Sequence, residues 1–257
     1  MDTNIGAIER VTQDRLVKLF KHVLKYTYLG NWENREGNSN IESDLLRTYL
    51  KDKYTAKEVD NAIFKLDQKA KNIANGLYIA NHEFYTLLRY GVNVQTDVSE
   101  KKKTVHLIDW NNPTNNDFYI AEEVTIYGDS ERRPDLVIYV NGIALAILEL
   151  KRSTISVHEG IRQNIRNQQE GYIPQFFTTI QLLFAGNDTE GLHYGVIKTP
   201  EKFWLRWKEP CGDPCAASLF TPEAYPNELN RSVLQFFEPS RLLEFIHDFI
   251  IYDGGVI

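Results

Sequence analysis

The feature that most constrains the fold is a pair of apolar runs joined by Asn141 and Gly142. The first run is LVIYV, residues 136–140, and the second is IALAILEL, residues 143–150. Both runs are rich in residues that favour strands, and an Asn-Gly dipeptide between such runs is a strong signal for a β-hairpin. Short apolar runs without alternation are typical of buried strands, so we expect this hairpin inside the core.

Charged residues stand at the open end of this hairpin, with Asp135 before the first strand and Glu149 and Lys151 at the end of the second. The loop length decides whether these groups meet, because successive residues of a strand point to opposite faces. A two-residue loop would separate Asp135 from Glu149. A three-residue loop, Val140 to Gly142, or a bulge near Asp135 brings both carboxylates and Lys151 to one face. We predict the three-residue loop or a compensating bulge.

Two carboxylates on one face of a hairpin form a candidate site for a hard cation such as Mg²⁺, for which Mn²⁺ can substitute. Asp135 and Glu149 would supply carboxylate oxygens, and the backbone carbonyl of Leu150 a third oxygen. Lys151 beside a bound metal could orient a water and offset charge on a phosphate oxygen. This set suits phosphodiester hydrolysis. The alternative interpretation is a hairpin with charged ends at the solvent boundary.

The rest of the chain predicts an α/β fold with a mixed central β-sheet flanked by helices. Residues 1–100 form a mainly helical N-terminal part that packs on the core, and residues 101–257 form the core and a C-terminal helix. The expected helices cover residues 8–26, 41–50, 56–70, 155–173 and 241–253, and residues 78–90 form a helical or mixed segment. Capping boxes are expected at Ser39 and Glu42 and at Thr55 and Glu58. Short strands, divided by turn residues, fill most of the second part.

Composition excludes several classes of protein. No run approaches the roughly 18 apolar residues of a membrane span, and the N-terminus lacks the features of a secretory signal. We therefore expect a cytoplasmic protein without a membrane partner. A net charge of -6 argues against a surface coated with basic groups, but leaves a local basic groove open. Cys211 and Cys215 are too few for a zinc site, and we interpret them as free thiols.

The motif residues are spaced as PD-(x)13-ExK, with Asp135, Glu149 and Lys151, and QxxxY follows at Gln168 and Tyr172. This set resembles the PD-(D/E)xK nuclease superfamily. Several longer stretches support a narrower resemblance: GNWENREGNSNIE, RRPDLVIYVNGIALAILELKRS, EGIRQNIRNQQ and IQLLFAGNDTEGLHYG. Together they are similar to the N-terminal region of the motor and endonuclease subunit of type I restriction-modification enzymes.

That resemblance implies a restriction-endonuclease-like fold and cleavage of double-stranded DNA within an ATP-driven complex of modification and specificity subunits. Asp135 and Glu149 would bind Mg²⁺, and Lys151 would be the catalytic lysine. Gln168 and Tyr172 would lie beside the metal site and support DNA engagement. ATP would act only through a motor region that this chain lacks.

Other charged residues are secondary candidates. Glu9 opens the first helix, where many related nucleases use an acidic ligand, although a glutamate there also favours the helix dipole without a metal. Four arginines near the motif are candidates for phosphate contacts: Arg132, Arg133, Arg152 and Arg166. Glu122 and Glu123 end a strand before the hairpin. One of them could face the metal, but we expect them at the surface.

These residues are compatible with three functions. The leading one is a metal-dependent endonuclease domain of a type I restriction enzyme. A stand-alone repair nuclease would keep the same site. An inactive nuclease-fold domain that serves DNA binding or subunit docking is the third, and the intact Asp-Glu-Lys set argues against it.

Overall fold

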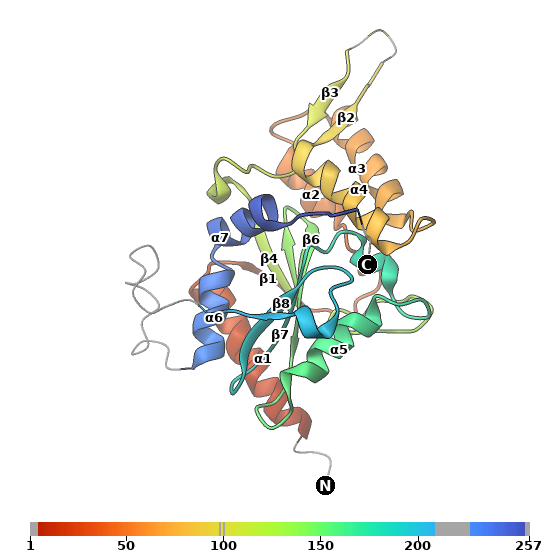
Figure 1. The fold of residues 1–257 in the computed structure, drawn as a ribbon. Helices are drawn as coiled ribbons and strands as arrows, with labels where there is room; N and C mark the ends of the chain where they lie inside the picture. Colours follow the sequence, from red (N-terminus) through yellow and green to blue (C-terminus); the bar gives the residue numbers. More distant parts are fainter. Residues whose placement is uncertain (1–4, 98, 100, 209–226, 255–257) are drawn as a thin grey trace.

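The computed structural model describes residues 5–97, 99, 101–208 and 227–254, so Cys211 and Cys215 lie outside the described residues (Figure 1). Its main element is a seven-stranded sheet of order β1-β4-β5-β6-β7-β8-β9. The strands are β1 (Thr27–Asn31), β4 (Phe118–Glu122), β5 (Leu136–Val140), β6 (Ile143–Leu150), β7 (Leu182–Asn187), β8 (Gly191–Gly195) and β9 (Leu205–Arg206). The pairs β1–β4 and β6–β7 are parallel and the others antiparallel, which confirms the mixed sheet.

Helices flank this sheet, as the order of elements predicted. They are α1 (Ile5–His22), α2 (Ser43–Leu50), α3 (Ala56–Lys71), α4 (Leu77–Tyr90), α5 (Val157–Asn167), α6 (Glu228–Phe236) and α7 (Pro239–Glu244), which runs into a π-helical turn at Phe245–Phe249. A small hairpin of β2 (Val92–Val94) and β3 (Lys103–Val105) extends away from the central sheet beside α3 and α4 (Figure 1).

The core divides into two clusters, one on each face of the sheet. Leu136 and Leu148 belong to the cluster that contains apolar residues of α1, α2 and α6. Val137 and Ile147 belong to the second cluster, which contains Val157 and Ile161 of α5. Because side chains alternate along a strand, Asp135 lies on the face of Val137, under α5.

The hairpin turn differs from the favoured prediction. Val140 pairs with Ile143, so the loop is Asn141–Gly142 alone and the predicted three-residue loop is wrong. The register then shifts, because Ile138 pairs with Ala146 while Tyr139 pairs with Ala144. Leu145 is therefore the extra residue of a β-bulge. This is the compensating bulge that was predicted as the alternative, although it lies in the middle of the hairpin.

The bulge changes which residues of the hairpin face each other. Beyond it, Leu136 pairs with Leu148. The same register continued by one residue places Asp135 opposite Glu149, at the open end of the hairpin. Directly opposed residues of an antiparallel pair point to the same face, so both carboxylates lie on one face.

Gly142 fixes how the N-terminal part meets the hairpin turn. Its φ is +87°, a conformation that suits glycine. A Cβ at this position would come within 2.7 Å of the backbone of Glu42 and Leu46 at the start of α2. The Glu42 amide also donates a 2.8 Å hydrogen bond to the Gly142 carbonyl.

The two predicted capping boxes have different outcomes. Thr55 and Glu58 form a complete capping box at the start of α3, as predicted. At α2 only half of the predicted box forms. The Glu42 carboxylate accepts a 3.3 Å hydrogen bond from the Ser39 amide, but the helix begins at Ser43 with Glu42 as its N-cap, and the Ser39 hydroxyl accepts from the Ile41 amide instead. The Glu42 carboxylate accepts hydrogen bonds of 3.0 and 2.6 Å from Arg35.

Some elements were missed or predicted too long. β1 and α6 were not expected, and the helix predicted for residues 155–173 ends at Asn167. β1 comes from the first hundred residues yet pairs with β4 at the edge of the central sheet. Within the part of the chain that the structure describes, no helix combines the length and apolar character that a membrane span needs.

Candidate active site

The motif residues gather where β5 begins and β6 ends. Glu149 is fully buried, while Asp135 and Lys151 are partly exposed. Oδ2 of Asp135 accepts a 2.6 Å hydrogen bond from the amide of Leu150. Nζ of Lys151 donates a 2.8 Å hydrogen bond to the carbonyl of Leu150. The backbone of Leu150 therefore ties the aspartate of one strand to the lysine of the next.

Helix α5 packs on the sheet face that carries the two carboxylates. Gly160 makes this possible, because a Cβ there would lie 3.1 Å from Cβ of Ala185, 3.5 Å from Cβ of Glu149 and 3.6 Å from Cγ of Lys151. One turn further along the helix, Nε2 of Gln163 donates a 2.7 Å hydrogen bond to Oε2 of Glu149. Gln163 was not among the predicted site residues, although its spacing of three from Gly160 places the two on one face of a helix.

The donor set fits a hard cation. Asp135 and Glu149 offer carboxylate oxygens, and the carbonyl of Leu150 lies between Glu149 and Lys151 in the chain. Mg²⁺ prefers oxygen ligands and often takes only one or two protein carboxylates. Among the described residues, no group of three or more histidine, cysteine, aspartate or glutamate side chains is arranged to hold a metal. A site here would therefore rest on two carboxylates and the backbone.

Gln168 and Tyr172 lie past the end of α5. Gln168 is buried at the helix C-cap, where Nε2 donates to the Asn164 carbonyl at 3.1 Å and Oε1 accepts from the Lys198 amide at 2.8 Å. Tyr172 follows in a turn, and the guanidinium of Arg132 lies 4.4 Å from its ring centroid. Gln168 therefore holds a loop and Tyr172 stacks on an arginine, while the amide that reaches Glu149 comes from Gln163.

The four candidate arginines have unequal surroundings. Arg133 forms ion pairs with Glu33 and, at 2.9 Å, with Glu123. Arg132 stacks on Tyr172 as described above. Arg152 is partly buried, and its Nε has no hydrogen-bond partner among the described residues. Arg166 is exposed on α5 and lines a cavity of about 470 Å³ with Gln169. Arg152 and Arg166 are thus the more available for a phosphate.

Among the acidic residues outside the motif that the structure describes, Glu122 lies away from it. Glu9 lies in α1, but its side chain is outside the described part of the structure. Glu122 is 5% exposed and points to the α1 face, so its predicted surface position is wrong. It accepts hydrogen bonds from Gln13 at 3.3 Å and from Tyr28 at 2.8 Å. Burial and this hydrogen bond to Glu122 raise the pKa of Tyr28 to about 12.

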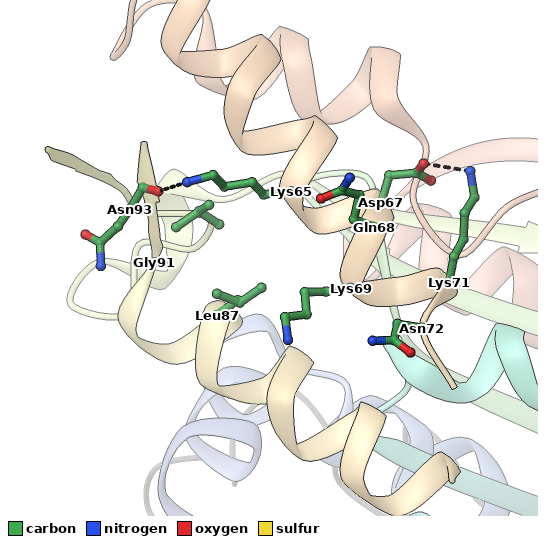
Figure 2. A pocket seen from close by; sticks show the side chains of 10 residues that line it. Lys65, Asp67, Gln68, Lys69, Lys71, Asn72, Leu87, Gly91 and Asn93 are labelled. Atoms are coloured by element: carbon green, nitrogen blue, oxygen red, sulfur yellow. Dashed lines mark hydrogen bonds and ion pairs between the residues drawn. The ribbon is translucent and has the colours of Figure 1, made fainter. Parts of the chain in front are cut away.

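A larger cavity, of about 750 Å³, lies away from the motif between α3, α4 and β2 (Figure 2). Its lysines are already engaged. Figure 2 shows Lys65 directed at Asn93 and Lys71 at Asp67, and hydrogen bonds of 2.5 and 2.6 Å join these pairs. Because these cations have partners within the protein, the size of this cavity alone does not mark it as the functional site.

The fold and the motif define a class of protein: an α/β protein with a mixed sheet, consistent with a nuclease-like fold, and an Asp-Glu-Lys set at one sheet end. Comparison with known families narrows this class. Residues 8–202 match the family described as the type I restriction enzyme R protein N terminus. The chain therefore belongs to this family.

Individual relatives agree with the family. A putative type I restriction enzyme MjaIXP endonuclease subunit of Methanocaldococcus jannaschii is 29% identical over 189 residues, covering 66% of this chain and 18% of the relative. The type I restriction enzyme HindI endonuclease subunit of Haemophilus influenzae is 25% identical over 272 residues, covering 97% of this chain and 24% of the relative. This chain thus spans about a fifth of the length of these relatives.

Proposed function

We propose that this chain is a metal-dependent endonuclease domain that hydrolyses phosphodiester bonds of double-stranded DNA. The observation that carries the proposal is the placement of Asp135 and Glu149 on one face of the sheet, with Lys151 beside them. The family match supports the same activity, because the relatives are called endonuclease subunits.

Each motif residue has a role that its contacts suggest. Asp135 and Glu149 would hold Mg²⁺ or Mn²⁺, with the Leu150 carbonyl as a further oxygen. When bound, the metal would polarise the phosphate and lower the pKa of a coordinated water. The Leu150 amide orients Asp135 by its 2.6 Å hydrogen bond. Lys151, released from the Leu150 carbonyl, would neutralise charge on a non-bridging phosphate oxygen.

Gln163 would act by orienting Glu149. Groups that hydrogen-bond to a metal ligand fix its direction and often matter nearly as much as the ligand. Here the side-chain amide of Gln163 donates a hydrogen bond to Oε2 of Glu149, and this bond would fix the orientation of the carboxylate towards a cation. Gly160 brings α5 close enough for this contact.

The domain would contact DNA mainly through the phosphates of the DNA backbone. Arg152 and Arg166 are the candidates for phosphate contacts, and such contacts position DNA without reading its sequence. Recognition of the DNA sequence would then fall to a specificity subunit, methylation to a modification subunit, and ATP chemistry to a motor region beyond these residues. The intact Asp-Glu-Lys set argues for an active domain rather than an inactive scaffold.

Plasmid cleavage by the assembled enzyme, with Mg²⁺ and ATP, tests the proposal. Asp135→Asn and Lys151→Gln should each abolish cleavage while ATP hydrolysis by the complex continues, because only the nuclease site is changed. Asp67→Asn, at the remote cavity of Figure 2, is a matched control and should cleave normally. Cleavage at the wild-type rate by both motif variants would show that the assignment is wrong.

Two further results of this experiment separate the alternatives. Binding of DNA by the wild type without any Mg²⁺-dependent cleavage would favour an inactive domain that serves DNA binding or docking. Cleavage by the chain alone, without ATP or other subunits, would favour a stand-alone nuclease.

A further inference from the structure

A cavity of about 450 Å³ lies at the turn end of the hairpin, far from the carboxylates. The turn is hydrogen-bonded to segments next to the cavity, because the Asn141 side chain donates 2.8 Å hydrogen bonds to the Leu107 carbonyl and to Oδ1 of Asn116. Tyr49, which lines the cavity, donates to the same Asn116 oxygen at 3.2 Å. Along β6, Glu149 is roughly 20 Å from this end of the strand, so the two sites are separate.

Aromatic rings form much of the cavity wall. Trp110 and His247 are partly exposed, and their ring centroids lie 5.0 Å apart. Tyr54 is held across the cavity by its hydroxyl, which accepts a 2.9 Å hydrogen bond from the His106 amide. Partly exposed aromatic faces that are fixed by such contacts are suited to stacking with a planar ring.

Two cations line the same cavity. Nζ of Lys53 lies 3.7 Å from the ring centroid of Tyr49, and Arg89 donates to the His247 carbonyl and, at 3.1 Å, to the Tyr85 hydroxyl. Neither cation forms an ion pair with any residue that the structure describes. The lysines of the larger cavity differ in this respect, since Lys69 and Lys71 are paired with carboxylates.

The carboxylate that lines the cavity, Asp109, already accepts hydrogen bonds from its own loop. Oδ2 of Asp109 accepts from the Asn115 side chain at 2.9 Å, and Oδ1 accepts from the Asn112 amide at 3.0 Å. These contacts, with the Asn115 hydrogen bond as the largest cause, lower the pKa of Asp109. Asp109 is thus hydrogen-bonded by its own loop. The charge of Lys53 also helps to lower its pKa, but no ion pair joins Lys53 or Arg89 to Asp109.

We propose that this cavity binds a nucleotide, with its base stacked on Trp110 and its phosphate held by Lys53 and Arg89. The pairing of aromatic faces with unpaired cations matches a ligand that is planar at one end and anionic at the other. A free nucleotide and a nucleotide unit within a DNA single strand share this chemistry. The site goes beyond the proposed nuclease activity and does not depend on it.

Titration calorimetry on the full chain tests the proposal, with dAMP, deoxyadenosine, inorganic phosphate and a short deoxyadenosine oligonucleotide as ligands. dAMP should bind more tightly than either of its parts, because the base and phosphate contacts act together. Lys53→Met should weaken dAMP binding by about tenfold, the loss expected for one charge-assisted contact. Trp110→Phe should abolish most of the tryptophan fluorescence quenching that dAMP causes.

Lys202→Met is the matched control, because the Lys202 ammonium also lies over an aromatic ring, 4.7 Å from the centroid of Phe203. It should leave dAMP binding unchanged. Tighter binding of the oligonucleotide than of dAMP would identify a single-stranded DNA site, and the reverse order a free-nucleotide site. Absence of dAMP binding at millimolar concentration, or equal binding by the Lys53 and Lys202 variants, overturns the proposal.

Asp135→Asn separates this site from the proposed active site. It should bind dAMP as the wild type does, whether or not the nuclease proposal holds. A loss of binding in Asp135→Asn without a loss in Lys53→Met would place the nucleotide at the carboxylates and overturn the assignment.

Discussion

Nε2 of Gln163 lies 2.7 Å from Oε2 of Glu149, so a helix that follows the motif in sequence supports one of its carboxylates directly. The contact joins α5 to β6, and Gly160 lets the helix lie close to the strand, because a Cβ there would be 3.5 Å from Cβ of Glu149. The position of Glu149 is therefore set by the packing of a helix as well as by its strand. This relationship makes two predictions about residues outside the motif.

The first prediction concerns the amide itself. Gln163→Leu removes the donor but keeps a similar volume, so Glu149 loses its orienting partner while α5 stays in place. We expect DNA cleavage by the assembled enzyme to fall by about 10- to 100-fold, with the half-maximal Mg²⁺ concentration raised. Gln169→Leu, at an exposed glutamine just past the same helix, should leave both quantities unchanged. An unchanged Mg²⁺ dependence in Gln163→Leu would argue against a role through the metal.

The second prediction concerns the approach of α5. In Gly160→Ala the new methyl group would meet Cβ of Ala185 at 3.1 Å, in a buried strand that has little room to move. We expect α5 to shift by a few tenths of an ångström and cleavage to fall, even though alanine favours the helix by about 1 kcal/mol. Thermal unfolding, measured together with cleavage, separates the change in stability from the change in activity.

A compensating change tests the cause of that loss. Ala185→Gly removes the opposing methyl group, so the double variant Gly160→Ala, Ala185→Gly should recover part of the activity that Gly160→Ala loses. If the double variant is no more active than Gly160→Ala, the contact between these two residues is not what limits the site.

The sequence predicted the hairpin well but not its register. The two apolar runs and Asn141–Gly142 identified a buried hairpin, and the turn is where it was expected. Nothing in IALAILEL distinguishes Leu145 as the extra residue of a bulge, because every position of the run is buried and every one except Glu149 is apolar. Periodicity carries no register information where both faces of a strand are covered.

The missed elements have related causes. β1 has the sequence TYLGN, which is short, contains glycine and is only partly buried, so its place in the sheet depends on pairing with β4. Gln163 lies outside the QxxxY pattern, whose glutamine is Gln168, and its contact with Glu149 depends on how α5 packs on β6. The Thr55–Glu58 capping box was predicted correctly because its hydrogen bonds join residues that are only three apart in the sequence.

The third prediction uses the contrast between two arginines. Arg166 is exposed and forms no ion pair with any residue that the structure describes, whereas Arg133 is paired with Glu33 and Glu123. Arg166→Gln should lower DNA affinity and reduce the slope of log K against log salt by about one, the effect of one lost phosphate contact. Arg133→Gln should change the slope less. Equal slopes for both variants would exclude Arg166 from the DNA interface.

The fourth prediction concerns alkaline pH. The pKa of Tyr28 is raised to about 12 by burial and by its hydrogen bond to Glu122, whereas an unfolded tyrosine titrates near 10. A phenol with a raised folded pKa contributes stability that is complete below about 10 and is lost as the pH rises towards 12. Urea unfolding should therefore show falling stability across this range. Tyr28→Phe should flatten that fall relative to the wild type.

The last prediction separates the backbone strain of a left-handed residue from the steric clash that a side chain at Gly142 would make with α2. Gly142 has a φ of +87° and a Cβ there would lie 2.7 Å from the backbone of α2, while Gly171 has a φ of +84° and nothing within 4 Å of the same position. Gly171→Ala should cost about 1 kcal/mol of unfolding free energy, from the left-handed conformation alone. Gly142→Ala adds a clash with rigid backbone and should cost about 3 kcal/mol or more. Urea denaturation of both variants measures the difference, and equal losses would mean that α2 does not rest on the turn as closely as these contacts require.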